Sequence, residues 1–84
     1  MITKEATVSL DDGLSARSIA LLVQTASRYE AVIRLSDGQK RMNAKSIMGM
    51  MALGLALGDI VTIEAEGTDE EEAASAIAEF LEGK

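Results

Sequence analysis

The sequence predicts an α+β protein with the architecture of an open-faced β-sandwich, in which three helices cover one face of a four-stranded antiparallel sheet in the order βαββαβα. Three observations predict this fold. Segments that alternate like half-buried strands are interspersed with segments whose apolar residues have helical spacing. The 84 residues are 48% hydrophobic and 26% charged, as in a globular protein with one core. A sheet covered on one face buries each apolar stripe once, so we expect residues 1–84 to form a single domain.

The first two elements are a strand and a helix. Alternation from Ala6 onward predicts a strand over residues 2–10, which a turn at residues 11–13 ends. A helix should then run from its N-cap, Ser15 or an immediate neighbour, to about Ser27. Its inner stripe has the i, i+3, i+4, i+7 spacing and consists of Ile19, Leu22, Val23 and Ala26.

A β-hairpin and a short helix come next. Residues 31–35 alternate, the Ser-Asp-Gly sequence of residues 36–38 supplies the positive φ of a tight turn, and residues 39–43 return as a strand. Residues 44–53 are too rich in Met and Ala for a strand and predict a helix. Asn43 and Ser46 can both satisfy free amides at its start.

The last two elements are a strand and a helix. Residues 59–66 form the clearest strand, with Val61, Ile63 and Ala65 on its inner face. The sequence from Thr68 to Glu71 has the pattern of a capping box and predicts the start of a helix that ends near Gly83. The inner stripe of this helix consists of Ala73, Ala74, Ile77, Ala78 and Leu81.

The composition excludes several classes of function. The chain has no Cys and no His, which removes disulfides, the usual zinc sites, thiol nucleophiles, Ser/His triads and phosphohistidine chemistry. With one Tyr, one Phe and no Trp, it offers no stacking platform for single-stranded nucleic acid. Glu64 and Glu66 share a strand face and are best explained as a solvated outer face. We expect no enzyme activity, no cofactor and no metal.

Charge is unevenly distributed along the chain. Residues 54–84 carry nine acids and one Lys, whereas residues 1–53 carry seven bases and five acids. The isoelectric point near 4.5 opposes binding to DNA, so a protein partner with an acidic patch is the better expectation. No basic leader and no run of roughly 20 apolar residues is present, so we expect a cytoplasmic protein without membrane contact.

Two motifs resemble the HPr family, the small phosphocarriers of the bacterial sugar phosphotransferase system. They are residues 13–18, Gly-Leu-Ser-Ala-Arg-Ser, and residues 43–51, Asn-Ala-Lys-Ser-Ile-Met-Gly-Met-Met. The similarity spans nearly the whole chain. At the family's phosphoryl-accepting histidine this chain has Ser15, and at a family proline it has Ser18. It therefore resembles a Crh-like paralogue that lacks the histidine.

The resemblance implies a regulatory protein of carbon catabolite control. In related HPr proteins the serine equivalent to Ser46 is phosphorylated by an HPr kinase/phosphorylase, and the product binds a catabolite control transcription factor. The resemblance assigns the partner surface to Arg17, Lys45, Ser46, Ile47, Met48 and Met51. A short helix cannot bury all four of its large apolar residues, including Met50, so some should form an exposed patch.

Alternatives remain open at each of these residues. Ser15 and Ser46 are interpreted first as helix N-caps, Arg17 as solvated and the methionines as core. A domain of this fold could bind a protein constitutively without phosphorylation. An atypical phosphocarrier using Ser15 is a weaker hypothesis, because a serine phosphate ester is far less reactive than a phosphoramidate. The sequence does not determine the oligomeric state.

Overall fold

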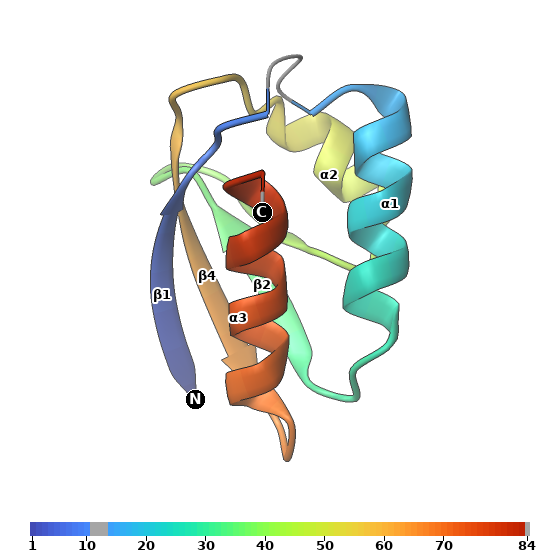
Figure 1. The fold of residues 1–84 in the computed structure, drawn as a ribbon, viewed down its shortest axis with the longest axis vertical. Coiled ribbons are helices and arrows are strands. Elements are labelled where there is room, and N and C mark those ends of the chain that lie inside the picture. The colour runs from blue at the N-terminus through green and yellow to red at the C-terminus, as the bar shows by residue number, and fades with distance from the viewer. Residues whose placement is uncertain (11–13, 84) are drawn as a thin grey trace.

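The computed structural model describes residues 1–10 and 14–83. It confirms the predicted α+β open-faced sandwich, with four antiparallel strands in one sheet and three helices in the order βαββαβα (Figure 1). The elements are β1 (Ile2–Thr7), α1 (Ala16–Ser27), β2 (Val32–Ser36), β3 (Arg41–Asn43), α2 (Ile47–Leu53), β4 (Ile60–Glu66) and α3 (Glu70–Leu81).

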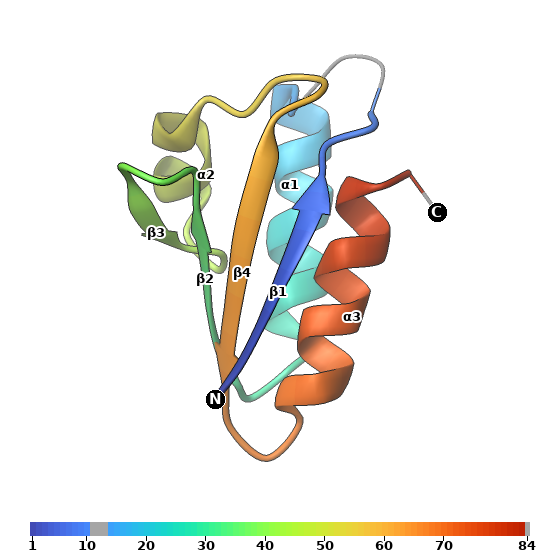
Figure 2. The same cartoon turned by 90° about the vertical axis from the view of Figure 1, so that its left-hand side faces the viewer.

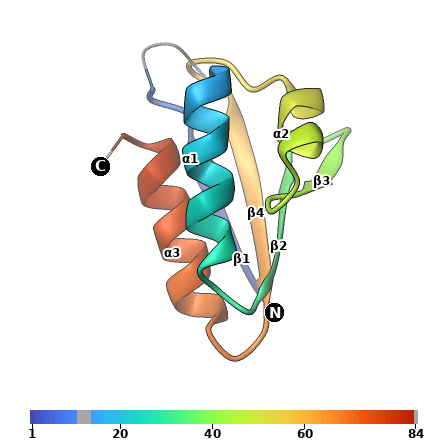
Figure 3. The same ribbon diagram turned by 90° about the vertical axis from the view of Figure 1, so that its right-hand side faces the viewer.

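The strand order in the sheet is β1-β4-β2-β3, and every neighbouring pair is antiparallel. Figure 2 shows the sheet in front of α1, and Figure 3 shows the opposite side, where α1 and α3 lie in front of the strands. Helix α1 contacts both α3 and α2, and α2 also contacts β3. The helices therefore cover one face, as the strand alternation predicts.

The predicted apolar stripes meet in one hydrophobic core. Ile33, Leu35 and Ile63 of the sheet are fully buried, and all of the predicted helical stripes contribute to the core. Buried residues of these stripes are Ile19, Leu22, Ala26, Val61, Ala65, Ala73, Ala74, Ile77 and Leu81. Val23 and Ala78 pack against this cluster from its edge. The core is aliphatic because the chain has so few aromatic residues.

Strand β1 is shorter than predicted. It ends at Thr7, although buried Val8 still donates to the Asp59 carbonyl at 2.9 Å and accepts from the Gly58 N–H at 2.8 Å. The Ser9 N–H then donates to the Leu81 carbonyl at 2.8 Å, at the end of α3. The chain thus leaves the sheet to satisfy a helix terminus. The predicted turn at residues 11–13 lies outside the described residues.

The hairpin is also looser than predicted, because β3 begins only at Arg41. The Asp37 carboxylate accepts the N–H groups of Gln39 at 3.0 Å and Lys40 at 2.8 Å, which closes a four-residue loop between the strands. These bonds lower the pKa of Asp37. Gly38 has the positive φ, 100°, that the sequence predicts for this turn.

The predicted capping box at the start of α3 is wrong. The N-cap is Asp69, and its side chain makes no capping bond. Its two carboxylate oxygens instead accept the N–H groups of Glu30 and Ala31, each at 2.9 Å, across 39 and 38 residues of sequence. The amides of the α1–β2 connection thus find their acceptor in Asp69, and these bonds lower the pKa of its carboxyl group.

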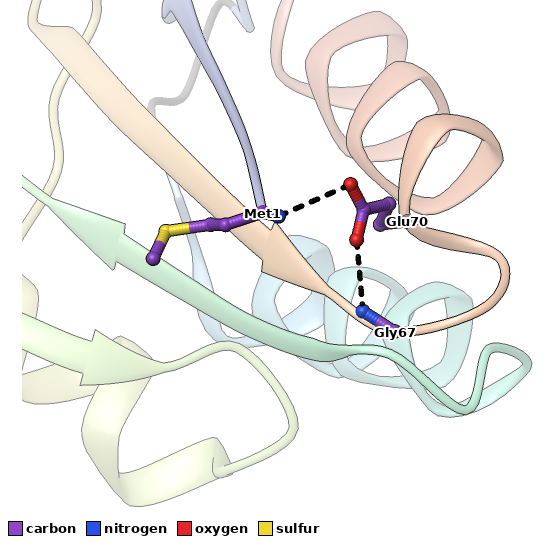
Figure 4. Close-up of polar contacts among 3 residues, drawn as sticks. All are labelled: Met1, Gly67 and Glu70. Carbon is purple, nitrogen blue, oxygen red and sulfur yellow. Dashed lines mark hydrogen bonds and ion pairs between the residues drawn. The ribbon is translucent and has the colours of Figure 1, made fainter.

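The side chain of Glu70 makes two contacts near Asp69, at the start of α3. Its Oε1 accepts the Gly67 N–H at 3.1 Å, and its Oε2 lies 3.4 Å from the amino group of Met1 (Figure 4). These two contacts connect Met1, the residue before β1, to the turn before α3. The bond from Gly67 is the larger cause of the lowered pKa of Glu70, and the ammonium adds to it.

Candidate functional site

Ser15 is the N-cap of α1, as the sequence predicts. Its backbone is extended, with φ −67° and ψ 168°, and its Oγ accepts the Ser18 N–H at 3.2 Å. The Ser15 hydroxyl also lies within hydrogen-bond distance of the Ser18 hydroxyl, at 3.4 Å. Both partners of Ser15 are thus groups of its own helix turn. Among residues 1–10 and 14–83, no side chain that could act as a general base is hydrogen-bonded to the Ser15 hydroxyl.

Ser46 is the N-cap of α2 and carries the equivalent bond. Its Oγ accepts the Gly49 N–H at 3.0 Å, and its carbonyl accepts the Met50 N–H at 3.0 Å. The predicted helix is shorter at its start, because Lys45 N–H donates to the Asn43 side chain at 2.8 Å and closes a turn before Ser46. As a residue, Ser46 is partly exposed.

Helix α2 divides its apolar residues between the core and the surface. Met50 and Leu53 are buried, whereas the exposed fractions are 51% for Ile47, 82% for Met48 and 56% for Met51. We call the three exposed residues Ile47, Met48 and Met51 the α2 surface. It follows Ser46 directly in the chain. The expectation that this short helix cannot bury all of its large apolar residues is confirmed.

Two lysines hold α2 at its ends. Lys45 Nζ donates to the Tyr29 carbonyl at 2.7 Å, which links the start of α2 to the residues after α1. Lys40 Nζ donates to the Ala52 carbonyl at 3.2 Å, near the end of α2. Sequence reasoning named Lys45 only as a partner contact and missed this structural bond, because Tyr29 lies 16 residues earlier in the chain.

Arg17 lies at the other end of the helix pair. It is exposed in the first turn of α1, where the Leu14 N–H donates to the Leu55 carbonyl at 3.3 Å, just after α2. Within residues 1–10 and 14–83, no hydrogen bond or ion pair joins Arg17 to Lys45 or Ser46. The start of α1 therefore lies beside the end of α2, whereas Ser46 is at the start of α2.

The residues also limit other chemistry. Within the described part of the chain, no group of three or more acidic side chains is arranged to hold a metal ion. Glu64 lies on the open face of the sheet and pairs with Arg41, at 2.7 Å between Oε1 and a guanidinium nitrogen. Glu64 is on the outer face of the sheet, but its Oε1 is buried in this pair, so the carboxylate is less solvated than the outer-face interpretation predicts. No helix among residues 1–10 and 14–83 is long and apolar enough to cross a membrane.

This arrangement is an open-faced α+β sandwich with a serine N-cap at the start of two helices, the second beside the exposed apolar residues of α2. A family model described as the PTS HPr component phosphorylation site matches residues 2–83. The chain belongs to the HPr family.

Individual relatives and solved structures are similar to this chain over nearly its whole length. The HPr-like protein Crh of Halalkalibacterium halodurans is 44% identical over 82 residues, which cover 98% of each chain. The crystal structure of the phosphocarrier protein HPr from Bacillus anthracis has a TM-score of 0.92 and 46% identity, over 95% of each chain. A crystal structure of Bacillus subtilis Crh, described as a dimer with a swapping domain, has a TM-score of 0.81 and 40% identity, over 100% of this chain and 97% of the other.

Proposed function

We propose that this chain is a single-domain, cytoplasmic regulatory adaptor of carbon catabolite control that is phosphorylated at Ser46 and acts through protein contacts. The observation that carries the proposal is the absence of any histidine from an HPr-family chain. Ser15 occupies the family's phosphoryl-accepting position, and its hydroxyl oxygen accepts the capping hydrogen bond of α1. Relay of a phosphoryl group from Enzyme I to a sugar permease component therefore has no competent acceptor.

The surroundings of Ser46 support phosphorylation there. Ser46 is a partly exposed residue, and the Gly49 N–H already donates to its Oγ. A phosphate would add a charge of about −1.5 to −2 and three strong acceptors at this point. Because the amide is in place, the new charge meets a donor without a change of fold. Modification thus alters the surface and leaves the core as it is.

The α2 surface supplies the apolar part of the contact, and Arg17 and Lys45 supply cations. A phosphoserine beside exposed Met48 and Met51 gives the partner both a charge to pair and apolar area to bury. Lys45 uses one of its three N–H donors on the Tyr29 carbonyl, which leaves two for a partner or the phosphate. We propose the catabolite control transcription factor as the partner and HPr kinase/phosphorylase as the modifying enzyme.

The first experiment tests the modification. Purified HPr kinase/phosphorylase and ATP should add one phosphate to the chain, as measured by intact mass, and none to Ser46→Ala. Ser15→Ala is the matched control, because it removes the other N-cap serine and should still accept one phosphate. Phosphate on any other residue, or no phosphate on the unaltered chain, contradicts the proposal.

A constitutive protein-binding domain is the second candidate, favoured by the exposure of the α2 surface in the unmodified chain. Capture of the catabolite control factor separates the two: the phosphorylated protein should bind and the unmodified protein should not. Ser46→Asp should bind weakly, since Asp carries less charge than phosphate. Equal capture of all three forms favours the constitutive binder.

The same protein also tests the remaining alternative of an atypical phosphocarrier. Incubation with Enzyme I and labelled phosphoenolpyruvate should leave the chain unlabelled. Label on Ser15 would establish the phosphocarrier and overturn the adaptor proposal.

A further inference from the structure

The most easily oxidised side chains of this protein are its methionines, because the sequence has no Cys, His or Trp. They differ sharply in exposure. Met50 is fully buried and Met42 is partly buried, whereas Met48 is 82% exposed and Met51 is 56% exposed. Met1, also exposed, belongs to the end of the molecule where Glu70 holds β1 (Figure 4). The two exposed thioethers of α2 are therefore accessible to small oxidants, whereas the third thioether of this helix is not.

The exposed pair shares one helix face. Met48 and Met51 are three residues apart, a spacing that brings their side chains together on the outside of α2. Met50 is on the opposite side and packs in the core with Leu53. Chemistry on the exposed pair consequently changes the α2 surface, and it leaves the contacts that hold the helix to the domain in place.

We propose that Met48 and Met51 form an oxidant-sensitive modification site that controls the apolar character of the α2 surface. The oxidant class is a peroxide. A sulfur lone pair attacks one oxygen of hydrogen peroxide, the O–O bond breaks, and the released hydroxide takes the remaining proton to leave as water. The thioether is oxidised to a sulfoxide, and the peroxide is reduced.

The consequence for binding rests on the proposed function. A sulfoxide carries a strong acceptor that must lose its water when the surface is covered, and this loss is unfavourable without a donor on the partner. Two sulfoxides on the α2 surface would therefore weaken docking even when Ser46 is phosphorylated. Because methionine sulfoxide reductases reverse the change, the site would act as a second, reversible input on the same surface.

The first test uses the unphosphorylated protein alone. During treatment with dilute hydrogen peroxide, peptide mapping by mass spectrometry should show Met48 and Met51 oxidised at least about tenfold faster than Met50, since a buried thioether reacts only through opening of the structure. In urea the five methionines should react at similar rates. Circular dichroism should show that the oxidised protein stays folded. Oxidation of Met50 as fast as Met48, or unfolding of the product, overturns the proposal.

The second test measures capture of the catabolite control factor by the Ser46-phosphorylated protein before and after peroxide. Oxidation should weaken binding about tenfold or more, and treatment with methionine sulfoxide reductases should restore it. The affinity of the phosphorylated variant M48L/M51L, measured before and after peroxide, should be the same in both measurements although Met1 becomes oxidised; a loss caused by peroxide in this variant would overturn the proposal.

The outcomes separate the two proposals. If the reduced phosphoprotein does not bind, the proposed function is wrong. If it binds and the oxidised form binds equally well, the oxidation site is wrong.

Discussion

In the unphosphorylated protein, replacement of Ser46 by Ala removes the capping hydrogen bond of α2. The Oγ of Ser46 accepts one bond, from the Gly49 N–H at 3.0 Å, and an Ala keeps the Cβ in its place. Loss of a serine cap destabilises a protein by about 1 kcal/mol, within a range of roughly 0.5–2 kcal/mol. Gly49 is partly exposed, so water can reach the freed amide, and the cost should stay within that range.

The loss should appear in global unfolding. Met50 and Leu53 anchor α2 in the shared core, so the helix should not unfold separately from the sheet. For a chain of this size, about 1 kcal/mol lowers Tm by about 4–8 °C. Ser46→Asp should recover most of the loss, because Asp caps a helix about as well as Ser. Ser15→Ala, which removes a bond of 3.2 Å at α1, should cost a similar amount.

Urea unfolding followed by far-ultraviolet circular dichroism measures these differences, since the chain has no Trp for fluorescence. The urea midpoint of Ser46→Ala should fall while the slope m stays unchanged. A loss above about 3 kcal/mol would exceed any cap and would refute the reasoning. Equal losses in Ser46→Ala and Ser46→Asp would also refute it, because the cap would then not be the source of the stability.

Three further predictions concern carboxylates that accept hydrogen bonds from backbone amides and the close packing at Gly67. Asp69→Asn should lower the urea midpoint, since an amide side chain has one acceptor oxygen for the two N–H groups that Asp69 binds. Asp37, Asp69 and Glu70 all have pKa values lowered from ordinary values of 3.8, 3.8 and 4.5 by hydrogen bonds from backbone amides. Their stabilisation is present above those ordinary values and is lost as pH falls through the lowered ones, so a pH series of urea midpoints should be flat on their account near neutrality and should drop below about pH 4.5. Gly67→Ala should destabilise the protein by about 1–3 kcal/mol by the same measurement, because φ is +152° and a Cβ would lie 2.8 Å from the Cα of Ala31; an unchanged midpoint would contradict the close packing there.

The sequence was most informative where the pattern is local and repeated. The stripe with Ile19, Leu22 and Ala26 predicts α1 to within a residue. Residues with helical spacing lie on one face of a helix, and that apolar face is the one that is buried. The two capping serines were equally predictable. A side chain that caps its own helix bonds three residues ahead, so the pattern contains both partners.

Predictions failed where a partner lies far along the chain. Thr68 and Glu71 have the spacing of a capping box, but Asp69 became the N-cap and turned its carboxylate to amides about 38 residues away. The bond from Lys45 to Tyr29 is hidden for the same reason. Only the assembled fold brings these groups together, and a single sequence contains no periodic signal for them. Strand ends were misplaced because Ser9 pairs with α3.

The two lysine bonds at the ends of α2 bear on how quickly a partner can recognise this helix. Lys45 links the start of α2 to the residues after α1, and Lys40 links the hairpin to the end of α2. These bonds hold the exposed side chains of α2 in place before a partner binds. A prearranged surface loses little conformational entropy on association, and the encounter requires no prior rearrangement. Binding of a partner to the α2 surface should therefore proceed in a single kinetic step. Its association rate constant should depend on charge and ionic strength.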